Sequence, residues 1–119
     1  MGIATKKNIS LVTLGIIARN EEEALPALLE DIRSQSFPHE RMEIILVDSM
    51  STDSTRKIMR EFVVSNKSSF YDVFICQNEK EIQPCGWNIV IDKSRGDAII
   101  RVDAHARIPS DFVAECVAV

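Results

Sequence analysis

Apolar residues in this chain switch repeatedly between two spacings, and this switch constrains the fold more than any other feature. A short run rich in β-branched residues, 11–17, is followed by the segment 21–34, in which apolar residues recur every three or four positions. The first spacing is typical of a buried strand and the second of a helix that covers a sheet. The alternation continues, with predicted strands at 42–47, 71–76 and 98–102 and predicted helices at 53–64 and 84–93.

Strands separated by helices imply right-handed β-α-β crossovers and a mostly parallel sheet with helices on both faces. We therefore predict an α/β protein with a Rossmann-like sheet, in one domain because 119 residues leave no room for a second. We assign residues 1–10 to an N-terminal extension and residues 11–119 to the domain. An apolar helix start near 108–113 runs on to the last residue, so we expect a domain truncated at its C-terminus.

The starts of the first two helices carry local signals. Asn20 stands where a side chain would cap the first helix, and Glu21 to Glu23 would place negative charge at its positive end. Thr52 and Asp53 precede the second helix and fit the same capping role.

Charge and hydropathy exclude several classes of partner. The net charge is -4 and the Lys and Arg residues are scattered, so we expect no binding to nucleic acid. The longest apolar stretches, 11–18 and 44–47, fall short of the roughly 20 residues that cross a bilayer, and no secretory signal is evident. We expect a cytoplasmic chain, which leaves open a parent enzyme at the inner face of the cell membrane.

The cysteines give no sign of a metal or redox motif. Cys76, Cys85 and Cys116 are odd in number and form no C-x-x-C pair, which suits a reducing compartment. We expect them to be buried structural thiols.

Three polar clusters follow predicted strands, at 19–21, 48–55 and 103–105. Ligands of doubly wound sheets bind outside the carboxyl ends of the strands, so we expect the three clusters to converge on one crevice. The chain has neither a P-loop nor the glycine fingerprint for dinucleotides. Anion binding would then depend on a metal ion.

The carboxylate of Asp103 and the imidazole of His105 are the best candidate metal ligands. Together they suit Mn²⁺ or Mg²⁺, which would bridge the phosphates of a nucleotide diphosphate. Taken alone, the same pattern also fits a capping aspartate and a surface histidine. Asp48 could accept hydrogen bonds from a base or a ribose, and Arg95 and Arg101 could meet phosphates or be solvated surface charges.

The order and spacing of these clusters resemble glycosyltransferase family 2. Residues 16–22 resemble the opening I-P-x-x-N-E-E, residues 47–55 resemble V-D-D-G-S-T-D-G-T, and residues 86–97 resemble A-R-N-x-G-x-x-x-A-x-G-D. Residues 101–106 stand where that family has its D-x-D metal motif. The Asp-Ala-His form is similar to transferases that build exopolysaccharides of the succinoglycan kind.

The resemblance implies the N-terminal, nucleotide-binding half of a GT-A fold in an inverting transferase of polysaccharide biosynthesis. It implies that Ala18, Glu21 and Asp48 hold the nucleoside, usually uridine. It further implies that Asp103 and His105 carry a divalent metal and the diphosphate of a UDP-sugar donor. Departures from the family pattern occur at Ile17, Ser49, Met50, Ser54, Val90 and His105.

The resemblance also places the catalytic base of the family well downstream of the D-x-D motif, in a region that this chain does not contain. Because that base must reach the acceptor hydroxyl, we expect the chain to be unable to transfer sugar by itself. One alternative is a non-catalytic interaction domain, in which the fold serves as a scaffold or exposes an unpaired edge to a partner, which could be a second copy of the chain in a homodimer. A weaker alternative is a receiver-like signalling domain with Asp48 as phosphate acceptor.

Overall fold

A five-stranded sheet forms the centre of the computed structural model, which describes residues 3–5 and 9–118. The strand order is β1-β5-β2-β3-β4. Four strands are parallel, namely β2 (Val12–Ala18), β3 (Met42–Asp48), β4 (Asp72–Gln77) and β5 (Ala98–Asp103). This confirms the predicted α/β class. The strand β1 (Ile3–Thr5) pairs antiparallel with β5, within the segment that the sequence analysis assigned to an extension.

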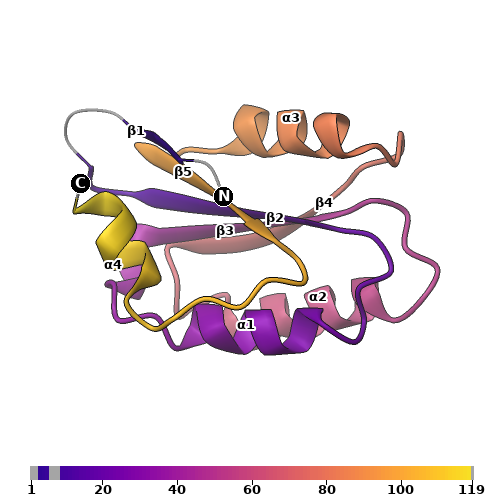
Figure 1. Ribbon diagram of the computed structural model, residues 1–119, viewed down its shortest axis with the longest axis horizontal. Coiled ribbons are helices and arrows are strands. Elements are labelled where there is room, and N and C mark those ends of the chain that lie inside the picture. The colour runs from indigo at the N-terminus through magenta and orange to yellow at the C-terminus, as the bar shows by residue number, and fades with distance from the viewer. Residues whose placement is uncertain (1–2, 6–8, 119) are drawn as a thin grey trace.

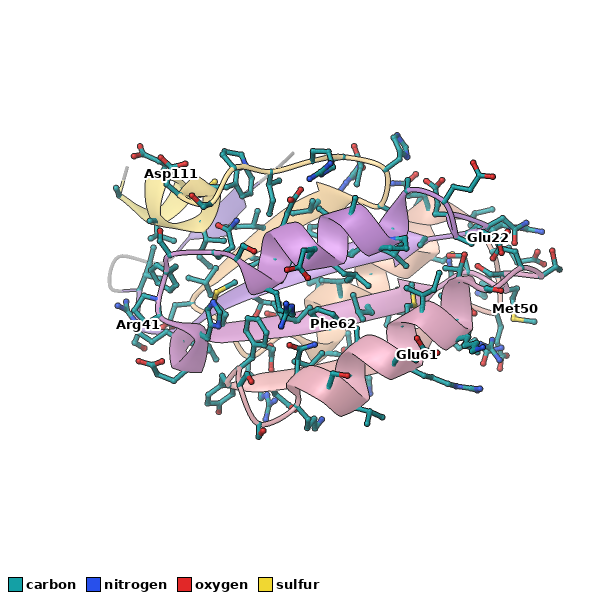
Figure 2. The ribbon with its side chains drawn as sticks, turned by 90° about the horizontal axis from the view of Figure 1, so that it is seen from below. Glu22, Arg41, Met50, Glu61, Phe62 and Asp111 are labelled. Atoms are coloured by element: carbon teal, nitrogen blue, oxygen red, sulfur yellow. The ribbon has the colours of Figure 1, made fainter. Side chains whose placement is uncertain are left out.

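Helices cover both faces of the sheet (Figure 1). One face carries α1 (Leu25–Arg33) and α2 (Thr55–Asn66), and the other carries α3 (Gln83–Lys93). The short helices η1 (His39–Arg41) and α4 (Phe112–Val117) lie near the amino ends of the parallel strands. Figure 2 shows the face of the sheet that α1 and α2 cover, with Glu22 and Met50 at the end where the parallel strands have their carboxyl ends. None of the helices that the structure describes is long and apolar enough to span a bilayer.

The main core lies between the sheet and the pair α1 and α2. Strand side chains alternate between faces, so one set of apolar residues meets these helices and the other meets α3. The first set includes the fully buried Leu14, Ile16, Ile44 and Leu46, in one cluster with Leu28 of α1. The second is smaller and includes Ile45 and Val47, in one cluster with Val90 of α3.

Gly15 allows α3 to lie close to the sheet. A Cβ atom at this position would lie 2.5 Å from Cγ1 of Val90, a distance that real Cβ atoms essentially never show. The missing side chain therefore fixes how near α3 can come to β2.

The prediction that Asn20 caps the first helix is wrong. The helix α1 begins at Leu25, and Ala24 at its N-cap position makes no side-chain hydrogen bond. Pro26 lies in the first turn, a position that suits proline because its missing N–H has no helical partner there. The helix therefore starts later than expected, which leaves Asn20 in the loop before it.

The cysteines are less buried than expected. Cys76, Cys85 and Cys116 are free thiols, and each is only partly buried. Even so, burial raises the pKa of the Cys76 and Cys116 thiols, which favours their unreactive protonated form.

Candidate functional site

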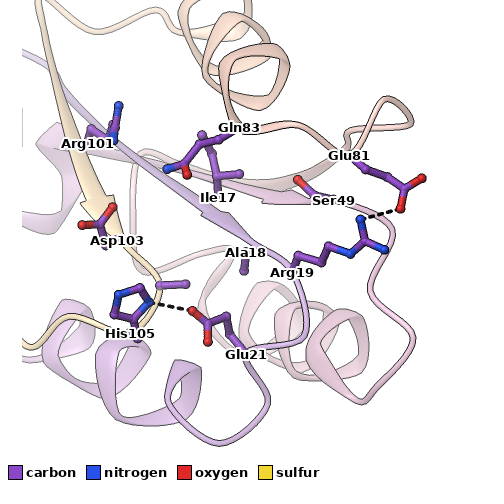
Figure 3. Close-up of a pocket in the computed structure, with 11 residues that line it drawn as sticks. Ile17, Ala18, Arg19, Glu21, Ser49, Glu81, Gln83, Arg101, Asp103 and His105 are labelled. Carbon is purple, nitrogen blue, oxygen red and sulfur yellow. Dashed lines mark hydrogen bonds and ion pairs between the residues drawn. The ribbon is translucent and has the colours of Figure 1, made fainter.

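A cavity of about 440 Å³ opens at the carboxyl edge of the sheet (Figure 3). This volume is in the usual range for small-molecule sites. The loops that leave β2, β3 and β5 meet there, together with the segment before α3. The lining residues are Ile17, Ala18, Arg19, Glu21, Ser49, Glu81, Gln83, Arg101, Asp103, Ala104 and His105. Four of the five predicted site residues therefore come together, namely Ala18, Glu21, Asp103 and His105.

A hydrogen bond between Glu21 and His105 joins two of the loops. Nδ1 of His105 lies 2.7 Å from Oε2 of Glu21 (Figure 3). The hydrogen bond to Glu21 and its negative charge raise the pKa of His105. The other ring nitrogen, Nε2, makes no hydrogen bond with any residue that the structure describes. Glu21 thus orients the ring and leaves Nε2 available to a ligand.

The loops after β2 and β3 hold each other in place. Oδ1 of Asn20 accepts a hydrogen bond of 2.8 Å from the backbone N–H of Thr52, and Oγ of Ser51 accepts one of 3.0 Å from the N–H of Asn20. The N–H of Glu21 donates to Oγ1 of Thr55 at 2.8 Å. Asn20 therefore braces the loop that carries Glu21, instead of capping α1.

Left-handed backbone conformations also gather at this edge. Asn20, Met50 and Glu81 have φ angles of 52°, 61° and 64°, one in each loop after β2, β3 and β4. Such conformations cost free energy in non-glycine residues and are common at binding sites. Across the cavity rim, Nη1 of Arg19 forms an ion pair of 2.5 Å with Oε1 of Glu81.

Asp48 is the predicted site residue that does not line the cavity. Its side chain is fully buried on the α1 and α2 face, whereas Asp103 belongs to the α3 face. Oδ2 of Asp48 accepts a 2.9 Å hydrogen bond from Nε of Arg56, and Oδ1 accepts one of 3.1 Å from the N–H of Ser51. The neighbouring Ser49 lines the cavity instead. A buried, ion-paired Asp48 is also unsuited to accept a phosphoryl group.

The two candidate arginines lie at opposite ends of the sheet. Arg95 pairs with the buried carboxylate of Glu43 at 2.7 Å and with Asp72 at 2.6 Å, near the amino ends of the strands. Arg101 lines the cavity. Sequence reasoning gave no role to Glu81 and Gln83, although the rule that ligands bind beyond strand carboxyl ends pointed to the segment after β4.

The residues at the cavity fit a metal ion that takes some of its ligands from the protein and the others from a substrate. Within residues 3–5 and 9–118, no three Asp, Glu, His or Cys side chains are grouped closely enough to hold a metal alone. Asp103 and His105 offer one carboxylate and one imidazole. Magnesium is commonly bound through one or two protein carboxylates, with its remaining ligands from phosphate oxygens and water, so Asp103 suits such an ion.

Solved structures with a similar fold include a mannosyltransferase. The mannosyltransferase PcManGT from Pyrobaculum calidifontis, in complex with GDP-Man and Mn²⁺, matches with a TM-score of 0.83 at 23% identity, over 92% of this chain and 31% of that one. TarS 1-349 from S. aureus, in complex with UDP-GlcNAc, matches with a TM-score of 0.78 at 21% identity, over 91% and 30%. The fold is therefore the N-terminal part of a GT-A glycosyltransferase fold.

Sequence comparison assigns the family. The model of glycosyl transferase family 2 matches residues 13–119, so the chain belongs to this family. It is 32% identical over 105 residues to a Methanococcus voltae dolichyl N-acetyl-α-D-glucosaminyl phosphate 3-β-D-2,3-diacetamido-2,3-dideoxy-β-D-glucuronosyltransferase, covering 88% of this chain and 32% of that protein. It is 30% identical over 95 residues to the succinoglycan biosynthesis protein ExoA of Rhizobium meliloti, covering 78% and 27%. The chain thus spans between about a quarter and a third of the length of these relatives.

Proposed function

We propose that this chain binds a nucleoside-diphosphate sugar, as the donor-binding part of an inverting glycosyltransferase that acts in polysaccharide biosynthesis. One observation carries the proposal, namely the convergence of Glu21, Asp103 and His105 on one cavity at the carboxyl edge of the sheet. The family match supports transferase chemistry, and the bound UDP-GlcNAc and GDP-Man of the two structural neighbours support a nucleotide-sugar donor. Among such donors we propose a UDP-sugar.

Asp103 and His105 are the residues that would hold a divalent cation, Mn²⁺ or Mg²⁺. Bound there, the cation would neutralise charge on the diphosphate leaving group. Glu21 fixes the ring of His105 through Nδ1, so that Nε2 is the nitrogen presented to the cavity. Ala18 and Ser49, at the ends of β2 and β3, form the wall where the nucleoside would lie.

Among the described residues that line the cavity, each carboxylate already has a partner or a proposed role. Three carboxylates line it, and two already have partners, Glu21 with His105 and Glu81 with Arg19. The third, Asp103, is the proposed metal ligand. We therefore propose that the group that deprotonates the acceptor hydroxyl is not among these residues, and that the chain by itself binds the donor without turning it over.

A calorimetric titration tests donor binding. UDP and GDP are added to the chain in EDTA and again with Mg²⁺ or Mn²⁺, and the same titrations are run on Asp103→Asn. We expect UDP to bind, the metal to tighten binding about tenfold or more, and Asp103→Asn to lose that increment. Asp111→Asn is the matched control, because Asp111 lies outside the cavity at the start of α4. The absence of UDP binding under every condition would overturn the proposal.

A further inference from the structure

Among the residues that the structure describes, one positively charged side chain of the cavity has no counter-ion. Arg101 lies on β5 two residues before Asp103, so both side chains belong to the same face of the sheet (Figure 3). The other arginine of the cavity, Arg19, is paired with Glu81. In the part of the chain that the structure describes, Arg101 forms neither an ion pair nor a hydrogen bond.

The Arg101 guanidinium lies over the ring of Trp87. Cζ of Arg101 lies 5.8 Å from the centre of the Trp87 ring, within the range of a cation-π interaction. Trp87 belongs to α3 and is partly buried against the smaller core cluster. The strand β5 is itself fixed on both sides, by β1 and by β2. The guanidinium is thus positioned before any ligand arrives, which lowers the entropic cost of binding one.

Arg101 is a partly buried residue, and among the described residues only the Trp87 ring compensates for the hydration that its side chain has lost. An anion in the cavity would restore the missing interactions. The planar fork of N–H donors in arginine matches the oxygens of a phosphate group. The proposed diphosphate position is beside Asp103, on the same wall of the cavity.

We propose that Arg101 binds the diphosphate of the donor directly, so that part of the affinity for the diphosphate does not depend on a metal ion. This inference rests on the proposed function, since it takes the cavity to be the donor site. In this proposal the two charged residues of this wall, Asp103 and Arg101, have separate roles. Asp103 recruits the cation, and Arg101 donates hydrogen bonds to phosphate oxygens.

Uridine and UDP distinguish a diphosphate contact from a nucleoside contact. Both are titrated into the full chain in EDTA, with binding followed by calorimetry. We expect UDP to bind more tightly than uridine, and Arg101→Gln to weaken UDP binding about tenfold while uridine binding is unchanged. The UDP affinity of Arg101→Lys should lie between those of the unchanged chain and Arg101→Gln, because lysine keeps the positive charge but lacks the planar fork of N–H donors.

Arg33→Gln is the matched control, because Arg33 pairs with Glu30 on α1 and does not line the cavity. It should bind both compounds as the unchanged chain does, and amide NMR spectra should show that each variant is folded. Unchanged UDP binding by Arg101→Gln, or equal weakening of uridine and UDP, overturns the role of Arg101 and leaves the donor site standing. Failure of the unchanged chain to bind UDP with or without metal overturns the proposed function, and this inference with it.

Discussion

Asp48 illustrates how the placement of a single residue changes the interpretation of the site. The family resemblance assigns it to the nucleoside, yet its carboxylate is fully buried and bonded to Arg56 and to the N–H of Ser51. In this arrangement Asp48 fixes the start of the loop after β3, whose next residue, Ser49, lines the cavity. A nucleoside contact by the Asp48 carboxylate would require the groups that bury it to move.

Removing the counter-ion of Asp48 should destabilise the fold. Arg56→Ala leaves a buried carboxylate without its charged partner, and we expect the free energy of unfolding to fall by about 1–3 kcal/mol. Arg60→Ala, a substitution of an exposed arginine on the same helix, should change it by less than about 0.5 kcal/mol. Urea unfolding followed by circular dichroism measures both. Equal stability of the two variants would show that the pair does not hold the loop.

At the scale of elements, the site depends on how two segments are attached to the sheet. The loop after β5 carries His105 and is tied to α1, because Asp31 accepts hydrogen bonds from Arg107 at 2.6 and 2.9 Å and from the N–H of Ile108 at 3.1 Å. On the other face, the contact of Val90 with Gly15 sets the position of α3, and with it Trp87 and Gln83.

The attachment through Asp31 should depend on pH. The Arg107 guanidinium and the N–H of Ile108 hold the pKa of Asp31 below its ordinary value. A carboxyl group with a lowered pKa in the folded state stabilises that state fully above its unfolded pKa of about 4, and less as the pH falls through the folded pKa. The stability advantage of the unchanged chain over Asp31→Asn should therefore be largest near neutral pH and shrink below about pH 4. Urea unfolding at a series of pH values measures it, and an advantage that grows with acidification would refute this role.

The contact between β2 and α3 can be tested by a double-mutant cycle. Gly15→Ala should lower the free energy of unfolding by about 1–3 kcal/mol, because the new methyl group overlaps Val90. Val90→Ala should make room for that methyl group. The double variant should then be more stable than the sum of the two single effects predicts. Strict additivity in urea unfolding would mean that this contact does not set the position of α3.

At the scale of the whole molecule, the sequence predicted the order of strands and helices and the edge of the sheet that carries the site. Hydrophobic spacing and the rule for parallel sheets were enough for this. The face to which Asp48 points was not predictable. Every residue of β3 is buried, so no alternation of apolar and polar residues reveals which face each side chain occupies.

Two further features depend on contacts between distant parts of the chain. The strand β1 has only three residues and pairs with β5, where Ile3 is the partner of Ile100. The role of Asn20 depends on the loop after β3, more than thirty residues away. Local spacing contains no signal for either contact. The position of Glu81 at the cavity also depends on a distant contact, because its ion-pair partner Arg19 follows a different strand.

The most direct test of the donor site is a map of where UDP binds. An amide NMR titration of the isotopically labelled chain with UDP and Mg²⁺ reports each backbone position. We predict the largest shifts at Ala18, Ser49 and Ala104, which lie at or directly after the carboxyl ends of β2, β3 and β5 and line the cavity. Shifts concentrated in the groove between α1 and α2, around Pro26 and Phe62, with none at Ala104, would contradict the account.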